Sequence, residues 1–445
     1  MKKAFAIFAV CLILVLGAVS IVVLHLREDR DQVSVTAETL AGDPAQAAGL
    51  TAKQSAQYDG RLYWNLTIPL DRPEDTETVF SSHQPLNQGR PGTPSIYLSV
   101  PTDGTYLLYS PYDLEAVANC NPGMPSMLPL LQEVVDRTPD GQQHAETLVL
   151  ADYMDVYPLN VEVTAPYTTS RSGDYDLSPV WQAFFSFPIP EEETWTVTAR
   201  KDSQGNLLEL SMACSAPSYS PNVLTAYTGD RLFFTLDGNS SGACVNTPGG
   251  FGIYSPALVW QDGDPYLELD VLSNVFPLPQ GTQVLNLSPS RDGKDLLLTT
   301  RLGEVCTLRV IDPETMAVKQ SLTIPDENLT GSLLEETCLL LWSDTQLHLY
   351  TQEAGAWTYR FSAPMNGFLL QGADYLTVAW NGERLALGTP LSSNSPGLVL
   401  AVYEAGTLTY LGTYATSLTE EDATPWPPSD PVCLVNGAEL ALAWE

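Results

Sequence analysis

Basic residues are scarce in this sequence: Lys and Arg total 20 against 53 Asp and Glu, which gives a formal net charge of −33. A protein that binds nucleic acid needs positive charge to neutralise phosphates, so this composition argues against that class of partner. Charged residues of both signs make up only 16% of the chain, below the roughly 25% typical of globular proteins. Uncharged polar residues must therefore cover much of the surface.

Metal-binding motifs are also missing. The chain has only four histidines, His25, His83, His144 and His348, and contains neither an H-E-x-x-H nor a C-x-x-C pattern. The sequence therefore predicts no zinc site. Asp262-Gly263 and Asp292-Gly293 lack the D-x-D-x-D-G spacing of a calcium loop and are interpreted as turns. We expect no metal and no cofactor.

A convincing catalytic nucleophile is not found either. Residues 238–242 match G-x-S-x-G, and residues 231–236 supply a preceding strand. A nucleophile elbow also needs a following helix, and the Gly- and Pro-containing residues 242–250 do not predict one. We interpret the segment as a loop and name no catalytic residues, although carboxylates from distant segments could still converge in the fold.

Beyond the first apolar run the chain has six cysteines: Cys120, Cys214, Cys244, Cys306, Cys338 and Cys433. An even number in an exported chain permits disulfides, with fifteen pairings. They are far apart, however, and a fold with a large core does not need such cross-links. Cys306 and Cys338 lie within or beside expected strands, where a thiol packs as a small apolar group. We expect most of the six to be unpaired.

The first long apolar run, residues 4–24, contains no charge. Twenty-one residues at helical rise span about 30 Å, the thickness of the hydrocarbon layer. We predict a signal-anchor transmembrane helix over residues 1–26; the alternative is a signal cleaved near Ala18-Val19-Ser20. Lys2 and Lys3 precede the run and favour a cytoplasmic N-terminus. We therefore expect a single-pass protein of the cell membrane whose remaining residues lie outside the cell.

Residues 27–59 are predicted to form a partly helical extracellular stalk. Residues 27–31 are charged and flank the apolar run, while Asp43-Pro44 suits the start of a short helix. From Gly60 the pattern changes to alternating strands, so we assign residues 60–445 to one all-β ectodomain.

The clearest unit of that ectodomain is residues 287–325. Asp292-Gly293 is predicted to form a turn before a strand over residues 296–300. A Gly303 loop then leads to a strand over residues 307–311, and Asp312-Pro313-Glu314 turns the chain into a third strand over residues 318–324. Such an antiparallel meander cannot bury both of its faces alone, so it implies neighbouring units of the same kind.

Further hairpin signals recur along the chain. We expect turns at Thr102-Asp103-Gly104, residues 202–205, Asn381-Gly382 and Asn436-Gly437, because Asn-Gly and Asp-Gly pairs accept positive φ. The one helix expected outside the membrane spans residues 126–136, with Leu128, Leu131 and Val135 on one side.

The two ends of the ectodomain are predicted to share a sheet. Residues 61–68 read as an apolar strand that stands well before the next strand signal, and residues 438–444 alternate with Leu440, Leu442 and Trp444 on one face. A strand at the chain end needs a pairing partner. We therefore expect residues 61–68 and the 432–444 hairpin to lie in one sheet.

Residues 310–318, V-I-D-P-E-T-M-A-V, resemble the V-I-D-x-x-T-x-x-V step of YVTN-type β-propeller blades. Leu287-Ser288-Pro289 with Asp292-Gly293-Lys294 is similar to the S-P-D-G-K turn of TolB-like blades, with Ser290 and Arg291 inserted. The match covers about one blade. The combination of signal-anchor, acidic stalk and propeller also resembles membrane-anchored surface proteins of gut-dwelling Firmicutes.

This resemblance implies a β-propeller whose blades are WD40/YVTN-like repeats. Residues 60–445 would make seven blades of about 55 residues or eight of about 48, and we expect seven because of insertions such as residues 110–143. The alternative is two or three β-sandwich modules in tandem.

Aromatic residues offer the candidate binding surface. Trp64, Trp342, Trp380 and Trp444 lie in strand-like runs and are expected in the core. Tyr153, Tyr157, Tyr167 and Tyr175 fall in a segment rich in Pro, Ser and Thr. These four tyrosines are the candidate residues of an exposed binding patch.

The sequence thus predicts a membrane-anchored extracellular binding or interaction protein with a propeller ectodomain and no evident catalysis. Expected partners are the membrane, through the N-terminal helix, and an envelope protein or a glycan. The alternatives are a cell-envelope hydrolase or lyase on the same scaffold, and a passive envelope assembly subunit.

Overall fold

The structure is a computed structural model of all 445 residues. It describes residues 31–58, 62–81, 95–99, 104–107, 127–157, 159–164, 184–214, 221–228, 231–237, 250–261, 264–290, 292–335, 337–370, 376–391, 397–418 and 435–444, together with Val15, Gly17, Leu114 and Trp181. The chain divides into two compact units, residues 1–89 with 328–445, and residues 90–327. Each unit is described by itself below.

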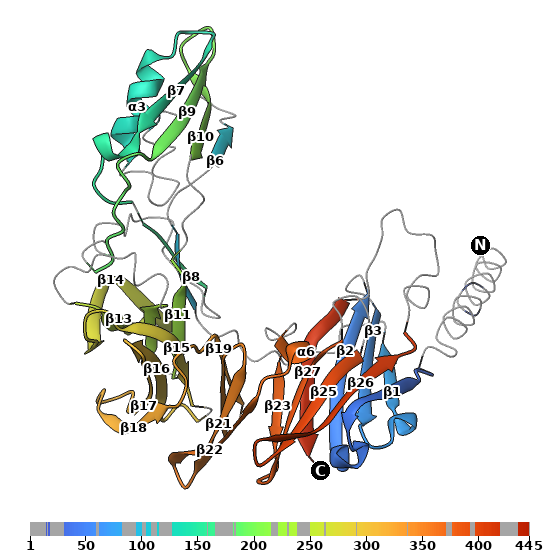
Figure 1. Ribbon diagram of the computed structural model, residues 1–445. Helices are drawn as coiled ribbons and strands as arrows, with labels where there is room; N and C mark the ends of the chain where they lie inside the picture. The colour runs from blue at the N-terminus through green and yellow to red at the C-terminus, as the bar shows by residue number, and fades with distance from the viewer. Residues whose placement is uncertain are drawn as a thin grey trace, which may run out of the picture. The chain divides into compact units, whose positions relative to one another are not determined.

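The expected meander in the second unit is confirmed (Figure 1). Its antiparallel sheet comprises β15 (Gln283–Pro289), β16 (Leu296–Leu302), β17 (Val305–Ile311) and β18 (Val318–Ile324). Leu296 and Leu298 of β16 are fully buried in the main core of this unit. β16 is buried on both faces for most of its length, which explains its unbroken leucine run.

A second meander of the same design precedes it in the chain. It comprises β11 (Val223–Tyr227), β12 (Leu232–Leu236), β13 (Gly252–Gln261) and β14 (Asp264–Pro277), paired in that order. Aromatic side chains fill the space beside it: Trp181 stacks on Phe234 with ring centroids 5.1 Å apart, and Phe185 meets Tyr254 edge-on at 4.6 Å. These rings fix the segment around Trp181 to the sheet.

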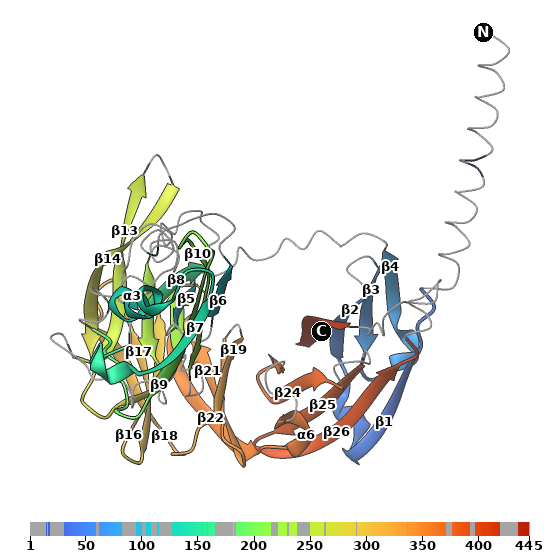
Figure 2. The same cartoon turned by 90° about the horizontal axis from the view of Figure 1, so that it is seen from above.

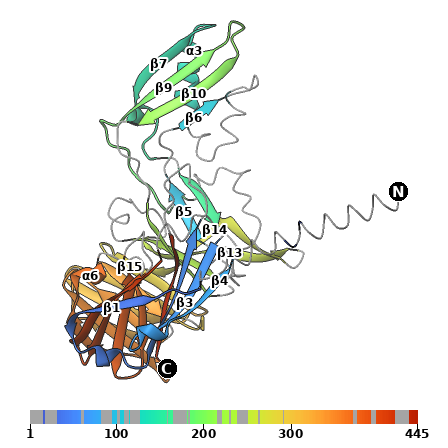
Figure 3. The same cartoon turned by 90° about the vertical axis from the view of Figure 1, so that its right-hand side faces the viewer.

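The second unit also contains a helix-covered sheet (Figure 3). Its strands β6 (Gly104–Leu107), β10 (Leu207–Cys214), β9 (Thr194–Lys201) and β7 (Gln143–Val149) pair in that order. Helix α3 (Leu128–Arg137) buries Leu130, Leu131, Val134 and Val135. The predicted helix over residues 126–136 is therefore confirmed, and the turn at residues 202–205 joins β9 to β10 as expected.

The hairpin expected around Thr102-Asp103-Gly104 is wrong. β5 (Ser95–Ser99) pairs with β8 (Asn160–Thr164), and β6 pairs with β10 instead. Both partners lie far along the sequence, so a local turn signal did not decide the pairing. Over the described residues, the sheet of β5 and β8 comprises these two strands, and Ile96 and Leu98 of β5 are buried in the main core.

The first unit holds two further meanders and one antiparallel sheet that combines strands from both ends of the described chain. One meander comprises β19 (Gly331–Glu335), β20 (Cys338–Trp342), β21 (Gln346–Glu353) and β22 (Ala356–Pro364). The other comprises β23 (Thr377–Trp380), β24 (Arg384–Pro390), β25 (Gly397–Glu404) and β26 (Thr407–Thr416), with β1 (Val35–Gly42) as a fifth strand. Asn381-Gly382 lies between β23 and β24, as the sequence predicts.

The two chain ends do share a sheet, as predicted (Figure 2). Its strand order is β27 (Val435–Trp444), β2 (Leu50–Tyr58), β3 (Leu62–Pro69) and β4 (Glu77–Ser81). The expected turn at Asn436-Gly437 is wrong, because both residues lie within β27 and Asn436 pairs with Ala56. The ladder between β2 and β27 has a register shift at this point, so the Asn-Gly pair lies at an irregularity within the strand and not at a turn.

The stalk expected over residues 27–59 is not formed between Val35 and Tyr58. β1 pairs with β26 and β2 pairs with β3 and β27, so these residues belong to two sheets. The Asp43-Pro44 signal does start a short 3-10 helix, η1 (Pro44–Ala47), and the Ala45 N–H donates to the Asp43 side chain at 3.0 Å. The single ectodomain expected over residues 60–445 likewise divides between two units.

The apolar run of residues 4–24 lies outside the described residues apart from Val15 and Gly17. Within the part of the chain that the structure describes, no helix is long and apolar enough to span a bilayer.

The protein is thus all-β, built mainly of four-stranded antiparallel sheets, with α3 as its longest described helix. Five sheets of the described residues share a simple strand order. In three of them four consecutive strands pair in chain order, and a fourth adds β1 to such a set. In the fifth, β27 from near the C-terminus pairs with β2, which is followed by β3 and β4. This is the order of a propeller blade. Seven such blades are not confirmed.

The expectations for buried side chains are largely met. Trp64 and Trp342 are buried, and Trp380 and Trp444 are half-buried. Cys306 in β17 and Cys338 in β20 are both buried thiols, as expected for small packed groups. Burial raises the pKa of the Cys306 thiol. Cys120, Cys244 and Cys433 lie outside the described residues.

Candidate functional site

The turn between β15 and β16 is closed by its own side chains. The Asp292 carboxylate accepts hydrogen bonds from the Ser290 hydroxyl at 2.9 Å and from the Lys294 backbone N–H at 3.2 Å. The Ser290 hydroxyl also accepts the backbone N–H of Asp295 at 2.9 Å. Gly293 has φ +68, which a residue without a side chain adopts at little cost. The D-G-K pattern therefore builds one fixed turn.

The turn between β17 and β18 is fixed in the same way. One carboxylate oxygen of Asp312 accepts the backbone N–H groups of Glu314 at 3.0 Å and Thr315 at 2.9 Å. The Asp312 N–H donates to the Ala317 carbonyl at 2.9 Å, so the turn closes on itself. Met316 takes the left-handed conformation with φ +58. The D-P-E-T-M-A segment is thus an Asx-stabilised turn.

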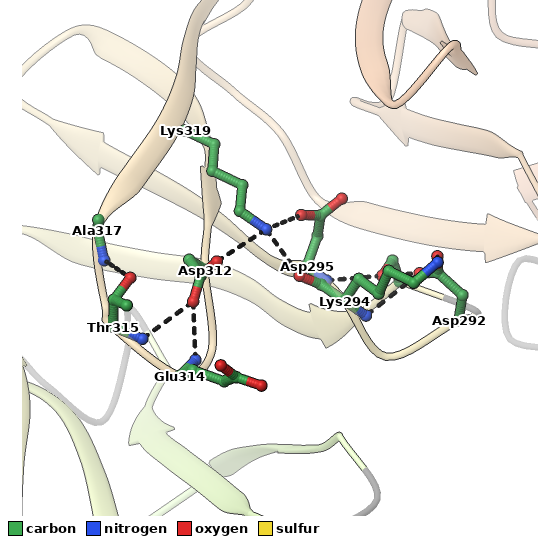
Figure 4. A network of polar contacts seen from close by, with 9 residues as sticks. Asp292, Lys294, Asp295, Asp312, Glu314, Thr315, Ala317 and Lys319 are labelled. Atoms are coloured by element: carbon green, nitrogen blue, oxygen red, sulfur yellow. Dashed lines mark hydrogen bonds and ion pairs between the residues drawn. The ribbon is translucent and has the colours of Figure 1, made fainter.

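Lys319 on β18 joins the two turns (Figure 4). Its ammonium lies 2.9 Å from the Lys294 carbonyl oxygen and 2.9 Å from a carboxylate oxygen of Asp295. It also lies 3.1 Å from the second carboxylate oxygen of Asp312. An ammonium has three N–H donors, and these three acceptors match them. The Asp295 side chain is only 9% exposed, so Lys319 compensates a nearly buried charge.

The contacts in this network shift the pKa values of Lys319, Asp312 and Asp292 away from neutral pH. The hydrogen bond to Asp295 raises the pKa of Lys319. The Thr315 backbone N–H and then Lys319 lower the pKa of Asp312 to about 2. The side-chain contact with Lys294 and then Ser290 lowers the pKa of Asp292 to about 2. Groups that stay charged near neutral pH are poorly matched to general acid–base work, so the network acts by fixing shape.

A third turn from the neighbouring sheet contacts the same place. The Arg231 guanidinium at the start of β12 donates to the Pro313 carbonyl at 2.6 Å and approaches that of Glu314 at 3.3 Å. The same guanidinium lies 4.9 Å from the centroid of the Phe233 ring. A Cβ on Gly293 would lie 3.0 Å from the Thr228 carbonyl oxygen. We call the three turns, comprising Thr228, Arg231, Ser290, residues 292–295 and residues 312–317, the turn cluster.

The turn cluster offers fixed polar groups to solvent. Asp292, Lys294, Glu314 and Thr315 are exposed, whereas Pro313 beneath them is buried. Charged side chains of both signs and a backbone in fixed turns can bind a polar partner at a small cost in conformational entropy. The cluster is therefore the candidate binding surface that the described residues support best.

The four candidate tyrosines do not form one exposed patch among the described residues. Tyr157 is buried and donates its hydroxyl to Glu193, a buried carboxylate that also accepts from the Trp195 indole N–H at 3.3 Å. Tyr153 is half-buried and donates to Glu133 at 2.6 Å, a bond that raises its pKa to about 12. Tyr167 and Tyr175 lie outside the described residues.

The remaining candidate motifs add no chemistry to the described chain. The G-x-S-x-G segment 238–242 and Asp262-Gly263 lie outside the described residues. Over the residues that are described, no group of three or more His, Cys, Asp or Glu side chains could hold a metal ion. His348 is buried in β21, as are Leu347 and Leu349 on either side of it in the strand.

The sequence predicts the turns themselves but not the residues that join them. Asp292-Gly293 and Asp312-Pro313 were visible as turns, whereas Lys319 was treated only as part of a strand. One signal could have found it: Lys319 is a charged residue on an outer strand directly after the D-x-x-T turn, where it can reach back to that aspartate.

Comparison with known proteins gives structural likenesses alone. No family model matches the chain, and no curated relative matches it. A putative 6-phosphogluconolactonase from Bacteroides fragilis is 9% identical with a TM-score of 0.27, and the match covers 83% of each chain. The β-propeller domain of Cps50 (Swd1) from Myceliophteria thermophila is 12% identical with a TM-score of 0.23, over 54% of this chain and 94% of the other.

A third solved structure, the β-propeller domain of the Trilobed protease from Pyrococcus furiosus, is 12% identical with a TM-score of 0.24, over 51% of this chain and 70% of the other. At these TM-scores the likenesses establish neither a family nor an activity.

Proposed function

We propose that this chain is a membrane-anchored extracellular interaction protein, with blade-like sheets as its scaffold and the turn cluster as its binding surface. The observation that carries the proposal is the Lys319 network, because it fixes two turns of one sheet through three contacts to a single ammonium. Arg231 adds the turn of a second sheet. Turns held this firmly suit recognition rather than catalysis.

The membrane anchor is supported by the sequence of residues 4–24 and by Lys2 and Lys3 before it. An uncharged segment of this length matches the hydrocarbon thickness, and the flanking lysines favour a cytoplasmic N-terminus. We propose a single-pass protein of the cell membrane with both folded units outside. Its partner is an envelope protein or a glycan, since the net charge of −33 is unsuited to nucleic acid.

Topology is tested with single-cysteine labelling of the full chain in intact cells. A membrane-impermeant maleimide should label a cysteine introduced at the exposed Ser321 without permeabilisation. A cysteine introduced beside Lys3 should be labelled only after permeabilisation. Labelling of the Ser321 variant only after permeabilisation would contradict the extracellular assignment.

The binding surface is tested with a photo-crosslinking residue placed at one position at a time in the full chain. Exposed Glu314 of the turn cluster is the test position, and exposed Thr323 on β18, outside the turns, is the matched control. Crosslinking in intact membranes should give a defined product from the Glu314 position only. Protease or glycosidase digestion of that product then tells a protein partner from a glycan. Equal products from both positions would count against the turn cluster.

A further inference from the structure

Strand β7 (Gln143–Val149) lies at the end of its sheet, with β9 as its only strand partner among the described residues (Figure 1). The outer edge of an end strand presents backbone N–H and C=O groups that another strand can pair with. Proteins commonly protect such edges with bulges or with charged side chains. Some end strands of this protein carry a register shift in their ladder, such as β14, β18 and β22, whereas β4, β11, β19 and β23 pair without one.

β7 lacks these protections. All seven of its residues pair with β9 without a register shift, from Gln143 opposite Arg200 to Val149 opposite Thr194. Gln143, Ala145 and Thr147 are exposed and uncharged. The one acidic residue of the strand, Glu146, is held by Arg137 of α3 on the helix-covered side. The edge is therefore regular, and within the described part of the chain no strand pairs with its outer side.

The sequence of β7 is complementary to itself when two copies run antiparallel about Ala145. Residue 143 then lies opposite residue 147 of the second copy, and residue 144 opposite residue 146. His144 and Glu146, which share the helix-covered side and lie 3.5 Å apart within one chain, would each meet the opposite type across the junction. Cross-strand pairs of this kind stabilise an antiparallel ladder.

The neighbouring registers are less favourable. Pairing about Glu146 would place two carboxylates directly opposite each other, and pairing about His144 would place two imidazoles opposite each other. Two carboxylates directly opposite each other destabilise a sheet by like-charge repulsion, and two imidazole rings would have to share the space at the axis. Pairing about Ala145 places only two small side chains at the two-fold axis, so one register is selected by charge and size.

We propose that a second copy of this chain pairs with β7 antiparallel about Ala145 and continues the four-stranded sheet across a two-fold axis. An antiparallel pair of identical strands satisfies two-fold symmetry by construction, because the same residues lie on both sides of the axis. Seven residues a side are fewer than the roughly 20–30 of a standard interface, so the dimer is weak. The inference does not depend on membrane anchoring or on the turn cluster.

The first test is a disulfide across the two-fold axis in the full-length chain. Directly opposite residues in an antiparallel pair have Cβ atoms about 4.5–5.5 Å apart, close enough for a disulfide with a small adjustment. The Ala145→Cys variant should therefore form a covalent dimer under mild oxidation. Ser321→Cys, at an exposed position on the end strand β18, is the matched control, and the unaltered chain gives the background from the native cysteines.

The second test examines the register. Gln143→Lys with Thr147→Lys would place a lysine opposite a lysine twice at the junction. Gln143→Lys with Thr147→Glu would place a lysine opposite a glutamate twice. Both double variants lose the Thr147 hydroxyl contact with Thr196, at 3.0 Å, so its loss cancels in the comparison.

Sedimentation should show self-association weakened about 2- to 30-fold in the lysine–lysine variant and strengthened in the lysine–glutamate variant, as expected for two like or opposite pairs. Circular dichroism confirms that both variants are folded. No excess of crosslinked dimer for Ala145→Cys over Ser321→Cys would overturn the proposal, as would equal association of the two double variants.

Discussion

The guanidinium of Arg384 lies 4.5 Å from the centroid of the Trp444 ring and so connects β24 to the last strand of the chain. Its Nη1 also donates to the Gln46 carbonyl in η1 at 2.7 Å. One side chain thereby contacts a segment near the N-terminus and the strand at the C-terminus. Both contacts lie in the first unit, where sequence ends that are nearly 400 residues apart meet in one sheet.

We expect Arg384→Ala to destabilise the first unit by about 1–3 kcal/mol, because it removes a cation–π contact and a charge-assisted hydrogen bond. Denaturant titration of the full chain measures this loss. Arg72→Ala is the control, since Arg72 is 62% exposed and contacts only surface aspartates; it should change stability by less than about 0.5 kcal/mol. Equal effects of the two substitutions on stability would show that the Arg384 contacts with Trp444 and Gln46 do not stabilise the first unit.

Deleting residues 438–445 should unfold the first unit. The deletion removes most of β27, bares the edge of β2, and takes Leu442 out of the core that contains Trp64 and Leu400. Limited proteolysis should then degrade the segments on both sides of the second unit, residues 31–81 and 328–418. Survival of residues 328–418 as a stable fragment would show that β27 is not needed and would favour separate tandem modules.

The sequence predicted strands where side chains alternate or where turns carry special residues. The 287–325 meander and the shared sheet of both chain ends follow from such signals. β1 gave none, because of its residues only Val35 is buried and the other seven are exposed. Its position rests on backbone pairing with β26, which leaves no periodic pattern in the sequence.

Long-range strand pairing and side-chain networks are the other features that the sequence did not predict. β5 pairs with β8, some sixty residues later, and nothing local in the Thr102-Asp103-Gly104 stretch encodes that choice. The turns of the candidate site could be predicted from Asp-Gly and Asp-Pro. That Lys319 reaches both depends on how two hairpins of one sheet lie side by side, which residue spacing does not show.

Lys319→Met should destabilise the second unit by roughly 1–3 kcal/mol, because it removes an ammonium that lies 2.9 Å from the nearly buried Asp295 carboxylate. Lys294→Met is the control: Lys294 is 78% exposed and pairs with Asp292 at the surface, so its loss should cost less than about 1 kcal/mol. Thermal unfolding of the full chain compares the two. Crosslinking from Glu314 should also weaken in Lys319→Met if the network shapes the turn cluster.

Cys306 and Cys338 should react slowly with a thiol reagent in the folded chain, because both are buried and a raised pKa keeps the Cys306 thiol protonated. Denatured protein kept without reductant should react with at least about four equivalents, as expected if most cysteines carry thiols. Mass spectrometry of the labelled peptides identifies each site. Fewer than two reactive cysteines would reverse the expectation that most are unpaired.

The stability of the fold should depend on pH in the acid range because of Asp312 in the turn cluster. Its pKa in the folded chain is lowered to about 2, chiefly by the Thr315 backbone N–H and then by Lys319, whereas an unfolded aspartate has a pKa of about 3.9. A carboxyl whose folded pKa is lowered stabilises the protein above the unfolded pKa, and the contribution is lost as pH falls through the folded pKa. Asp312 therefore stabilises the fold fully above about pH 4 and progressively less between about pH 4 and pH 2.

Asp312→Asn tests this assignment, since the amide oxygen can still accept the Glu314 and Thr315 N–H groups while the charge facing Lys319 is lost. Denaturant titrations at several pH values should show the variant less stable than the original chain at pH 7, with a difference that shrinks as the pH approaches about 2. Glu304→Gln, at an exposed tip between β16 and β17, supplies the control for removing one negative charge. A stability difference for Asp312→Asn that is independent of pH would show that the turn depends on the geometry of this side chain rather than on its charge.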